Sequence, residues 1–218
     1  MSSPDENTDI SQNKFLFRLS IIQMIPAVVG IFIAIVALFA ALNESDAVRK
    51  QQQAAVWPHL QVDRSNTSTD QNVGLSLTVR NRGIGPARVR AASVSLDGEM
   101  LMSWDDLFSR LNPISERSYP RTDSRVGSSV LVPSDDVVVI SLNTDVYAQY
   151  DLASLNDVAT REDTETLILS LRSAFSEDRV TMELCYCSVF DDCWHVSNID
   201  RDPKPVQNCS GYSNENNF

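Results

Sequence analysis

The chain has 218 residues, with 29 Asp and Glu against 18 Lys and Arg, so its formal net charge is -11. Binding of nucleic acid needs clustered Lys and Arg to displace counterions, and this composition argues against such a partner. A chain of this length accommodates one domain with a sizeable core and a separate anchor segment. The densest basic segment is predicted to be the solvated face of a hairpin: Arg80, Arg82, Arg88 and Arg90.

The N-terminal region combines a polar tail with an apolar stretch. Residues 1–13 are polar and acidic without an apolar period, which favours disorder. Residues 21–42 are apolar except for Gln23 and, as a helix, span roughly 33 Å, enough for a hydrocarbon core of about 30 Å. The main alternative, a cleaved signal peptide, usually has an apolar region of only about 7–15 residues. We therefore predict an uncleaved transmembrane anchor over residues 14–42, in contact with the lipid bilayer.

Small and polar residues recur along this segment at alternating spacings of three and four, a period of 3.5 that places them on one face of a helix. We call this face the small-residue seam: Ser20, Gln23, Ala27, Gly30, Ala34, Ala37 and Ala41. Small residues allow membrane helices to approach closely. The seam predicts packing against a membrane-embedded protein partner or a second copy of the chain, and chance spacing of common small residues is the alternative.

The charges that flank the apolar segment do not decide by their number which end of the helix faces the cytoplasm. Lys14 and Arg18 precede it, Arg49 and Lys50 follow it, and the positive-inside count is tied. Arg18 lies nearer the apolar run than Arg49 does, and the acidic segment 44–46 follows the run, so we expect the N-terminus in the cytoplasm. The four cysteines weigh more, because disulfides persist in oxidising compartments. The C-terminal domain is then periplasmic or extracellular.

The pattern changes twice after the anchor. Residues 43–57 are rich in helix formers and predict a helical stalk that ends at Trp57, because the residue before Pro58 is pushed out of the α region. Apolar residues then alternate with period two over residues 73–79, which predicts a strand. A tight connection over residues 81–87 leads to a second strand with a one-residue slip, typical of a β-bulge, and then to a turn at Asp97 and Gly98.

The stretch 75–98, with strand, Asn-x-Gly-x-Gly-Pro-Ala, strand and Asp-Gly turn, resembles the first hairpin of bacterial immunoglobulin-like adhesion modules of the CARDB type. The resemblance covers about 25 residues. It implies a mainly β fold, an immunoglobulin-like antiparallel β-sandwich that binds or spaces other molecules outside the cell. We assign this domain to residues 58–200, with short helical insertions.

The rest of the chain is predicted from local signals. A capping box beginning at Ser103 predicts a short helix, and residues 146–158 fit a second helix only loosely. Three strands are expected at the end of the domain, over residues 167–175, 180–189 and 193–198. Residues 201–218 are predicted to form a flexible tail tied down by Cys209.

The four cysteines gather near the C-terminus. Period two places Cys185 and Cys187 on the outer face of one strand, and Cys193 and His195 on the outer face of the next. An even number of cysteines behind an export-type anchor favours disulfides, and we predict that Cys187 bonds Cys193 and that Cys185 bonds Cys209. A zinc site built from Cys185, Cys187, Cys193 and either His195 or Cys209, or free thiols, are the alternatives.

No catalytic motif is evident, and neither a catalytic residue nor a cofactor is assigned. We interpret His59 as a surface residue and His195 as structural rather than as a base for a thiolate. The expected function is that of a non-enzymatic, membrane-anchored extracytoplasmic binding or scaffold module, an accessory or sensing subunit of a membrane assembly. The alternative is a membrane-tethered redox or zinc-binding protein that uses the cysteine–histidine face.

Overall fold

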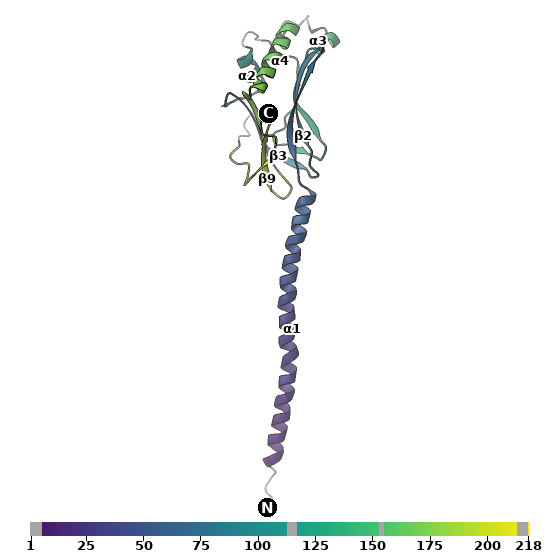
Figure 1. Cartoon of the computed structure of the whole chain (residues 1–218), viewed down its shortest axis with the longest axis vertical. Helices are drawn as coiled ribbons and strands as arrows, with labels where there is room; N and C mark the ends of the chain where they lie inside the picture. Colours follow the sequence, from purple (N-terminus) through teal and green to yellow (C-terminus); the bar gives the residue numbers. More distant parts are fainter. Residues whose placement is uncertain (1–5, 113–116, 153–154, 213–217) are drawn as a thin grey trace, which may run out of the picture. The chain divides into compact units, whose positions relative to one another are not determined.

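The computed structural model describes residues 6–112, 117–152, 155–212 and 218, shown in Figure 1. The chain divides into two compact units, Met1–Gln52 and Gln53–Phe218. The first is helical and the second is mainly β.

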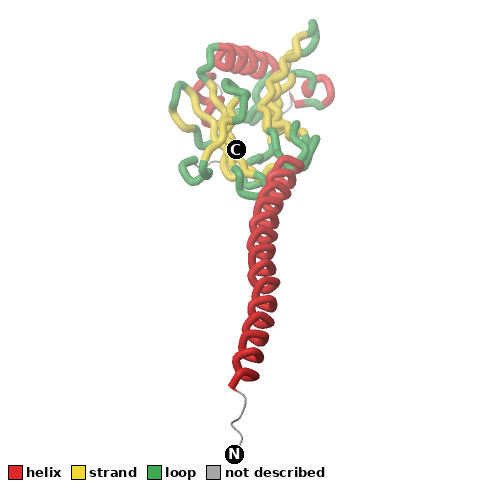
Figure 2. The backbone as a smooth tube through the Cα atoms, turned by 60° about the horizontal axis from the view of Figure 1, so that its bottom comes forward, coloured by secondary structure: helices red, strands yellow, loops and turns green. Residues whose placement is uncertain are grey.

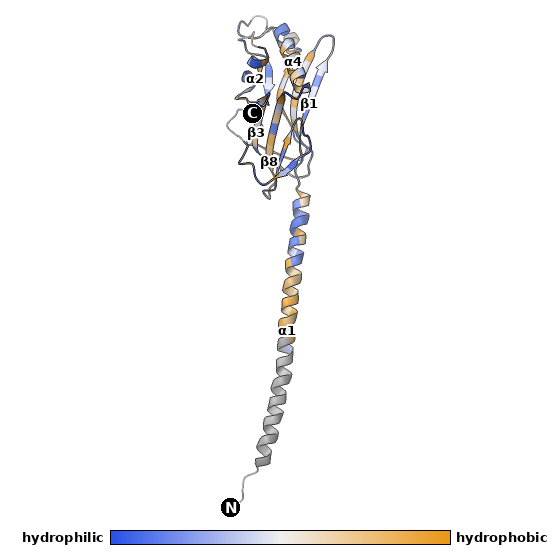
Figure 3. Ribbon diagram, turned by 60° about the vertical axis from the view of Figure 1, so that its left-hand side comes forward, coloured by the Kyte–Doolittle hydropathy of each residue, from blue (hydrophilic) through white to orange (hydrophobic). Residues whose placement is uncertain are grey.

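The N-terminal unit is formed by α1 (Glu6–Ala55), a helix of 50 residues that contains Pro26. Residues 6–13 are helical rather than disordered as expected, because extending an existing helix costs less than nucleating one. Residues 1–5 lie outside the described range. The apolar turns of α1 are followed by hydrophilic ones (Figure 3). Among the described residues one segment, Val29–Ala55, is long and apolar enough to cross a membrane, with a mean hydropathy of 1.8.

The second unit contains two antiparallel sheets (Figure 1). The four-stranded sheet has the order β1 (Leu60–Ser68), β2 (Val73–Asn81), β7 (Asp136–Asn143), β5 (Arg121–Asp123). The six-stranded sheet has the order β10 (Lys204–Val206), β9 (Cys193–Ser197), β8 (Val180–Cys187), β3 (Ala87–Leu96), β4 (Glu99–Met100), and β6 (Val130–Leu131) pairs with β3. The prediction of a mainly β domain is confirmed.

The connection between β2 and β3 differs from the expected hairpin. β2 pairs with β1 and β7, whereas β3 pairs with β4, β6 and β8, so the chain passes from one sheet to the other. The buried Asn81 fixes this crossing, because its side chain accepts from the backbone N–H groups of His59 and Gly83 and donates to the carbonyls of Gly85 and Leu131. Gly85 must lack a side chain, since a Cβ there would stand 1.8 Å from the Val56 carbonyl oxygen.

The arginines around this crossing are consequently not one solvated face. Arg80 forms ion pairs with Asp63 at 3.3 Å and Asp136 at 3.4 Å. Arg88, on the other sheet, pairs with Asp191 in the turn between β8 and β9. The crossing therefore distributes the basic segment over both sheets.

Two local predictions about β3 are confirmed. Its register against β8 shifts between Val89 and Ala91, which is the expected bulge. Asp97 and Gly98 form the two-residue turn to β4 with positive φ angles of 52° and 84°, as tight hairpin turns require.

Among the described residues, the domain contains the helices α2 (Trp104–Leu111), α3 (Val146–Gln149) and α4 (Arg161–Ser176). The predicted cap of α2 is confirmed, because the Ser103 side chain accepts from the Asp106 N–H. The strand expected over residues 167–175 is wrong, since this segment lies within α4. Its first turn has a capping box between Thr160 and Asp163.

Helix α4 covers the core at the end of the domain where β1 ends and β2 begins (Figure 2). Its buried side chains recur with helical spacing: Thr164, Leu167, Ile168, Leu171, Ala174 and Phe175. The Arg172 guanidinium donates to the carbonyls of Gly74, at 2.7 Å, and Thr67. Apolar side chains from both sheets, α2 and α4 form one continuous core.

The C-terminal segment is more ordered than the flexible tail that was expected. Lys204–Val206 forms β10, which pairs with β9 and extends the sheet. Phe218 is buried, and its ring lies edge-on to Trp104 with centroids 5.1 Å apart. Backbone pairing and an apolar terminal residue therefore hold parts of the tail on the domain, in addition to Cys209.

Candidate functional site

The hairpin of β8 and β9 positions the cysteines. Its register sets Cys187 opposite Cys193, Tyr186 opposite Trp194, and Cys185 opposite His195. Since opposed residues of an antiparallel pair share a face, the three cysteines lie on the face away from Tyr186. This arrangement follows from the period-two pattern of the sequence.

The four sulfurs lie at disulfide distance in the two expected pairs. The sulfurs of Cys185 and Cys209 are 2.04 Å apart, and those of Cys187 and Cys193 are 2.10 Å apart. No cysteine of the chain is left unpaired. The first pair attaches the tail to the middle of β8, and the second closes the hairpin.

The cysteine face is covered rather than open. Cys185 is fully buried, Cys187 and Cys193 are buried, and Cys209 is half-buried. An outward-facing strand position predicts exposure only when nothing packs over it, and here the segment around Cys209 does. The sulfurs are thus shielded from solvent reagents.

The zinc alternative involves only some of the residues named from the sequence. Sulfurs of Cys187, Cys193 and Cys209 lie within 4.8 Å of one another, a group that within the described residues includes neither Cys185 nor His195. Zinc binds thiolates, and a sulfur in a disulfide is not one. The three sulfurs could hold a metal only after both disulfides were reduced.

His195 lies beside cysteines that are already paired, so they offer no thiol that its ring could activate. Its ring stacks on Tyr212 with centroids 4.9 Å apart, and its Nε2 lies 3.7 Å from a Glu183 carboxylate oxygen. The opposed Cys185 sulfur is bonded to Cys209. The other histidine, His59, is half-buried rather than on the surface, because the β2–β3 crossing packs against its backbone. Neither histidine forms a nucleophile–base pair in the part of the chain that is described.

The small-residue seam lies entirely on α1. Gly30, Ala34, Ala37 and Ala41 are exposed, and a Cβ added at Gly30 would meet no atom within 4 Å. Ser20, Gln23 and Ala27 are in the helix, but their side chains lie outside the described part. These four residues of the seam are thus available for contact, and the partner of the seam stays a prediction.

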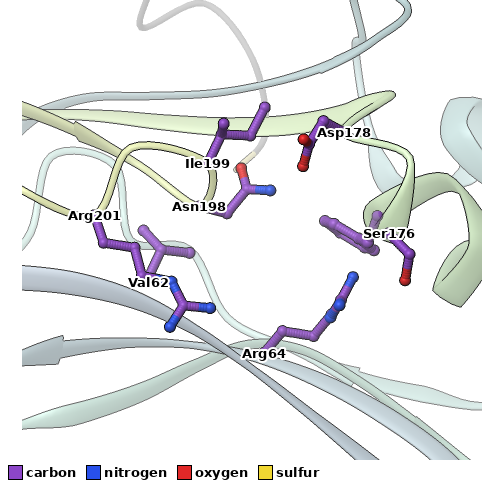
Figure 4. Close-up of a pocket in the computed structure, with 8 residues that line it drawn as sticks. Val62, Arg64, Ser176, Asp178, Asn198, Ile199 and Arg201 are labelled. Carbon is purple, nitrogen blue, oxygen red and sulfur yellow. The ribbon is translucent and has the colours of Figure 1, made fainter.

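A pocket that the sequence did not indicate lies between β1, the C-terminal end of α4 and the segment after β9 (Figure 4). Its volume is about 350 Å³. It is lined by Val62, Arg64, Phe175, Ser176, Asp178, Asn198, Ile199 and Arg201. These residues come from distant parts of the sequence and carry no motif, so only the fold brings them together.

No family model, curated protein or solved structure matches this chain. The function is therefore inferred from its own geometry.

Proposed function

We propose that this protein is a non-enzymatic binding or scaffold module, anchored in a membrane by α1, with its β domain outside the cytoplasm. The observation that carries the proposal is the pairing of all four cysteines at disulfide distance. Structural disulfides persist in oxidising compartments and are rare in the cytosol. An apolar segment long enough to cross a bilayer precedes the domain and supplies the anchor.

An immunoglobulin-like sandwich of the CARDB type is the fold that we propose for the domain. Two antiparallel sheets with one shared core, and a connection that crosses between them after β2, support this proposal. The 16-residue helix α4 is an addition to such a sandwich. A rigid domain of this kind presents its loops and end pockets to a partner.

The anchor itself offers a second contact surface. In lipid, helix association depends on close packing and on interhelical hydrogen bonds. The exposed seam residues of α1 suit such packing against a partner helix or a second copy of α1. The protein would then be an accessory or sensing subunit of a membrane assembly.

A membrane-tethered redox or zinc protein is the second candidate. It is favoured by the 3.8 Å separation between the sulfurs of Cys187 and Cys209, which belong to different disulfides. Burial of the sulfurs speaks against it, because redox-active cysteines are accessible to their partners.

The side of the membrane is tested with reporter fusions to the full chain. A phosphatase that folds only after export, attached behind Phe218, is expected to be active, and a green fluorescent protein at the same place is expected to be dark. The matched control attaches both reporters ahead of Met1, where the opposite result is expected. A bright C-terminal fluorescent protein with an inactive phosphatase would overturn the proposal.

A further inference from the structure

The pocket between β1 and α4 is built by three segments that the fold holds in place. Val62 and Arg64 come from β1, Phe175 and Ser176 from the last turn of α4, and Asp178 from the turn that follows α4. The segment after β9 supplies Asn198, Ile199 and Arg201. A volume of about 350 Å³ falls within the range of small-molecule sites, about 300–1,000 Å³.

Two guanidinium groups face this pocket without a carboxylate partner (Figure 4). Within the described residues no ion pair involves Arg64 or Arg201, although the chain has a large acidic surplus. Arg121, by contrast, pairs with both Asp105 and Asp123. The guanidinium carbon of Arg64 lies 5.8 Å from the centroid of the buried Phe175 ring, and this contact holds the charged group at the pocket wall.

Other polar groups of the pocket are already occupied by the fold. The Asn198 side chain accepts from the Met182 N–H at 2.6 Å and donates to the Val180 carbonyl at 3.0 Å. The Ser176 hydroxyl donates to the Arg172 carbonyl at 2.7 Å. The charged groups left to meet a ligand are therefore the two guanidiniums and the Asp178 carboxylate, which forms no ion pair within the described part of the chain.

We propose that this pocket binds a small zwitterion of the α-amino-acid type. The guanidiniums of Arg64 and Arg201 would receive its carboxylate, since arginine donates two parallel hydrogen bonds to such a group. Asp178 would receive its ammonium group. A ligand with anionic groups alone, such as inorganic phosphate, would gain from the arginines but be repelled by Asp178. A zwitterionic ligand is proposed here for the binding module described above, so this inference rests on that proposed function. It does not depend on the side of the membrane on which the β domain lies.

The first test measures binding to the full chain in detergent micelles. The shift in unfolding temperature is recorded with each proteinogenic amino acid in turn, and titration calorimetry then gives the Kd of the best one. At least one amino acid is expected to raise the unfolding temperature. Its amide, which lacks the carboxylate, and the matching carboxylic acid, which lacks the amine, are both expected to bind at least about tenfold more weakly. Absence of any shift, or equal binding of the amide, would overturn the proposal.

Variants then locate the site. Arg64→Gln and Arg201→Gln are each expected to weaken binding about tenfold or more, whereas Arg82→Gln, an exposed arginine outside the pocket, leaves the Kd unchanged. Asp178→Asn is expected to weaken binding of the amino acid but not of the acid that lacks its amine. Unfolding temperatures measured without ligand show whether each variant is folded. If Arg64→Gln does not fold, Arg64→Lys replaces it. Binding that survives both arginine changes would contradict this site while leaving the membrane location of the domain untouched.

Discussion

The Tyr186 hydroxyl accepts a hydrogen bond of 3.2 Å from the Leu60 backbone N–H. Tyr186 lies on β8 of one sheet and Leu60 begins β1 of the other, so this contact joins the two sheets at the start of the domain. Both residues are fully buried. Burial raises the pKa of Tyr186 to about 12, against an ordinary value of 10.0, because the low-dielectric core disfavours the phenolate.

This contact predicts an alkaline limit to stability. Since the folded pKa of Tyr186 lies above the unfolded value, the contribution of this residue is complete below pH 10 and decreases between pH 10 and 12, by up to about 3 kcal/mol. Tyr186→Phe should lower the free energy of unfolding by about 1 kcal/mol at neutral pH and flatten its decline above pH 10. Urea unfolding across this pH range, with Tyr150→Phe at an exposed site as control, measures both effects. Parallel curves for wild type and Tyr186→Phe would contradict this account.

The crossing between the sheets depends on Asn81. Asn81→Ala would leave two backbone N–H groups and two carbonyls without their side-chain partner. We expect the free energy of unfolding to fall by about 3 kcal/mol. Asn66→Ala, at an exposed position of β1, is the matched control and should change the free energy of unfolding by less than about 1 kcal/mol. Equal effects in urea titrations would show that the crossing is not held by Asn81.

The two disulfides should contribute unequally. The bond between Cys185 and Cys209 closes a loop with a sequence separation of 24, and the bond between Cys187 and Cys193 closes a loop with a separation of 6. Loop-closure entropy then gives about 3 kcal/mol for the first and about 2 kcal/mol for the second. Replacing the first pair by alanine should lower the unfolding temperature more than replacing the second. The reverse order would mean that anchoring the tail adds little to stability.

The seam of α1 makes a prediction that is independent of the β domain. Ala34→Leu should weaken association of the membrane segment by about 1 kcal/mol, or about fivefold, in a bacterial two-helix reporter, because a larger side chain prevents close packing. Ile33→Leu, which lies outside the seam, is the control and should have no effect. Unchanged association of Ala34→Leu would remove the helix-packing role of the seam.

Period-two alternation predicted β2, the bulge in β3, and the side of the hairpin on which Cys185 and Cys187 lie. It failed over residues 167–175, where Leu167, Leu169 and Leu171 alternate as in a strand although the segment is helical. The helical alternative was visible in Leu167, Ile168 and Leu171, and in the capping box at Thr160.

The pocket could not be predicted from the sequence. Arg64 lies on β1 and Arg201 follows β9, and only the packing of β1 against the end of α4 and the segment after β9 brings them to one cavity. Single arginines carry no spacing signal. The covering of the cysteine face could be anticipated, by contrast, because the predicted bond between Cys185 and Cys209 brings the tail onto that face.

The redox state of the cysteines in the cell shows whether the β domain lies outside the cytoplasm. Cells producing the full chain are denatured in the presence of a membrane-permeant alkylating reagent, so that buried free thiols also react, and the mass of the intact protein is measured. A second sample is denatured and reduced before it is alkylated. If the domain lies outside the cytoplasm, no cysteine is expected to be alkylated in the unreduced sample and four in the reduced one. Four alkylated cysteines in the unreduced sample would contradict this location.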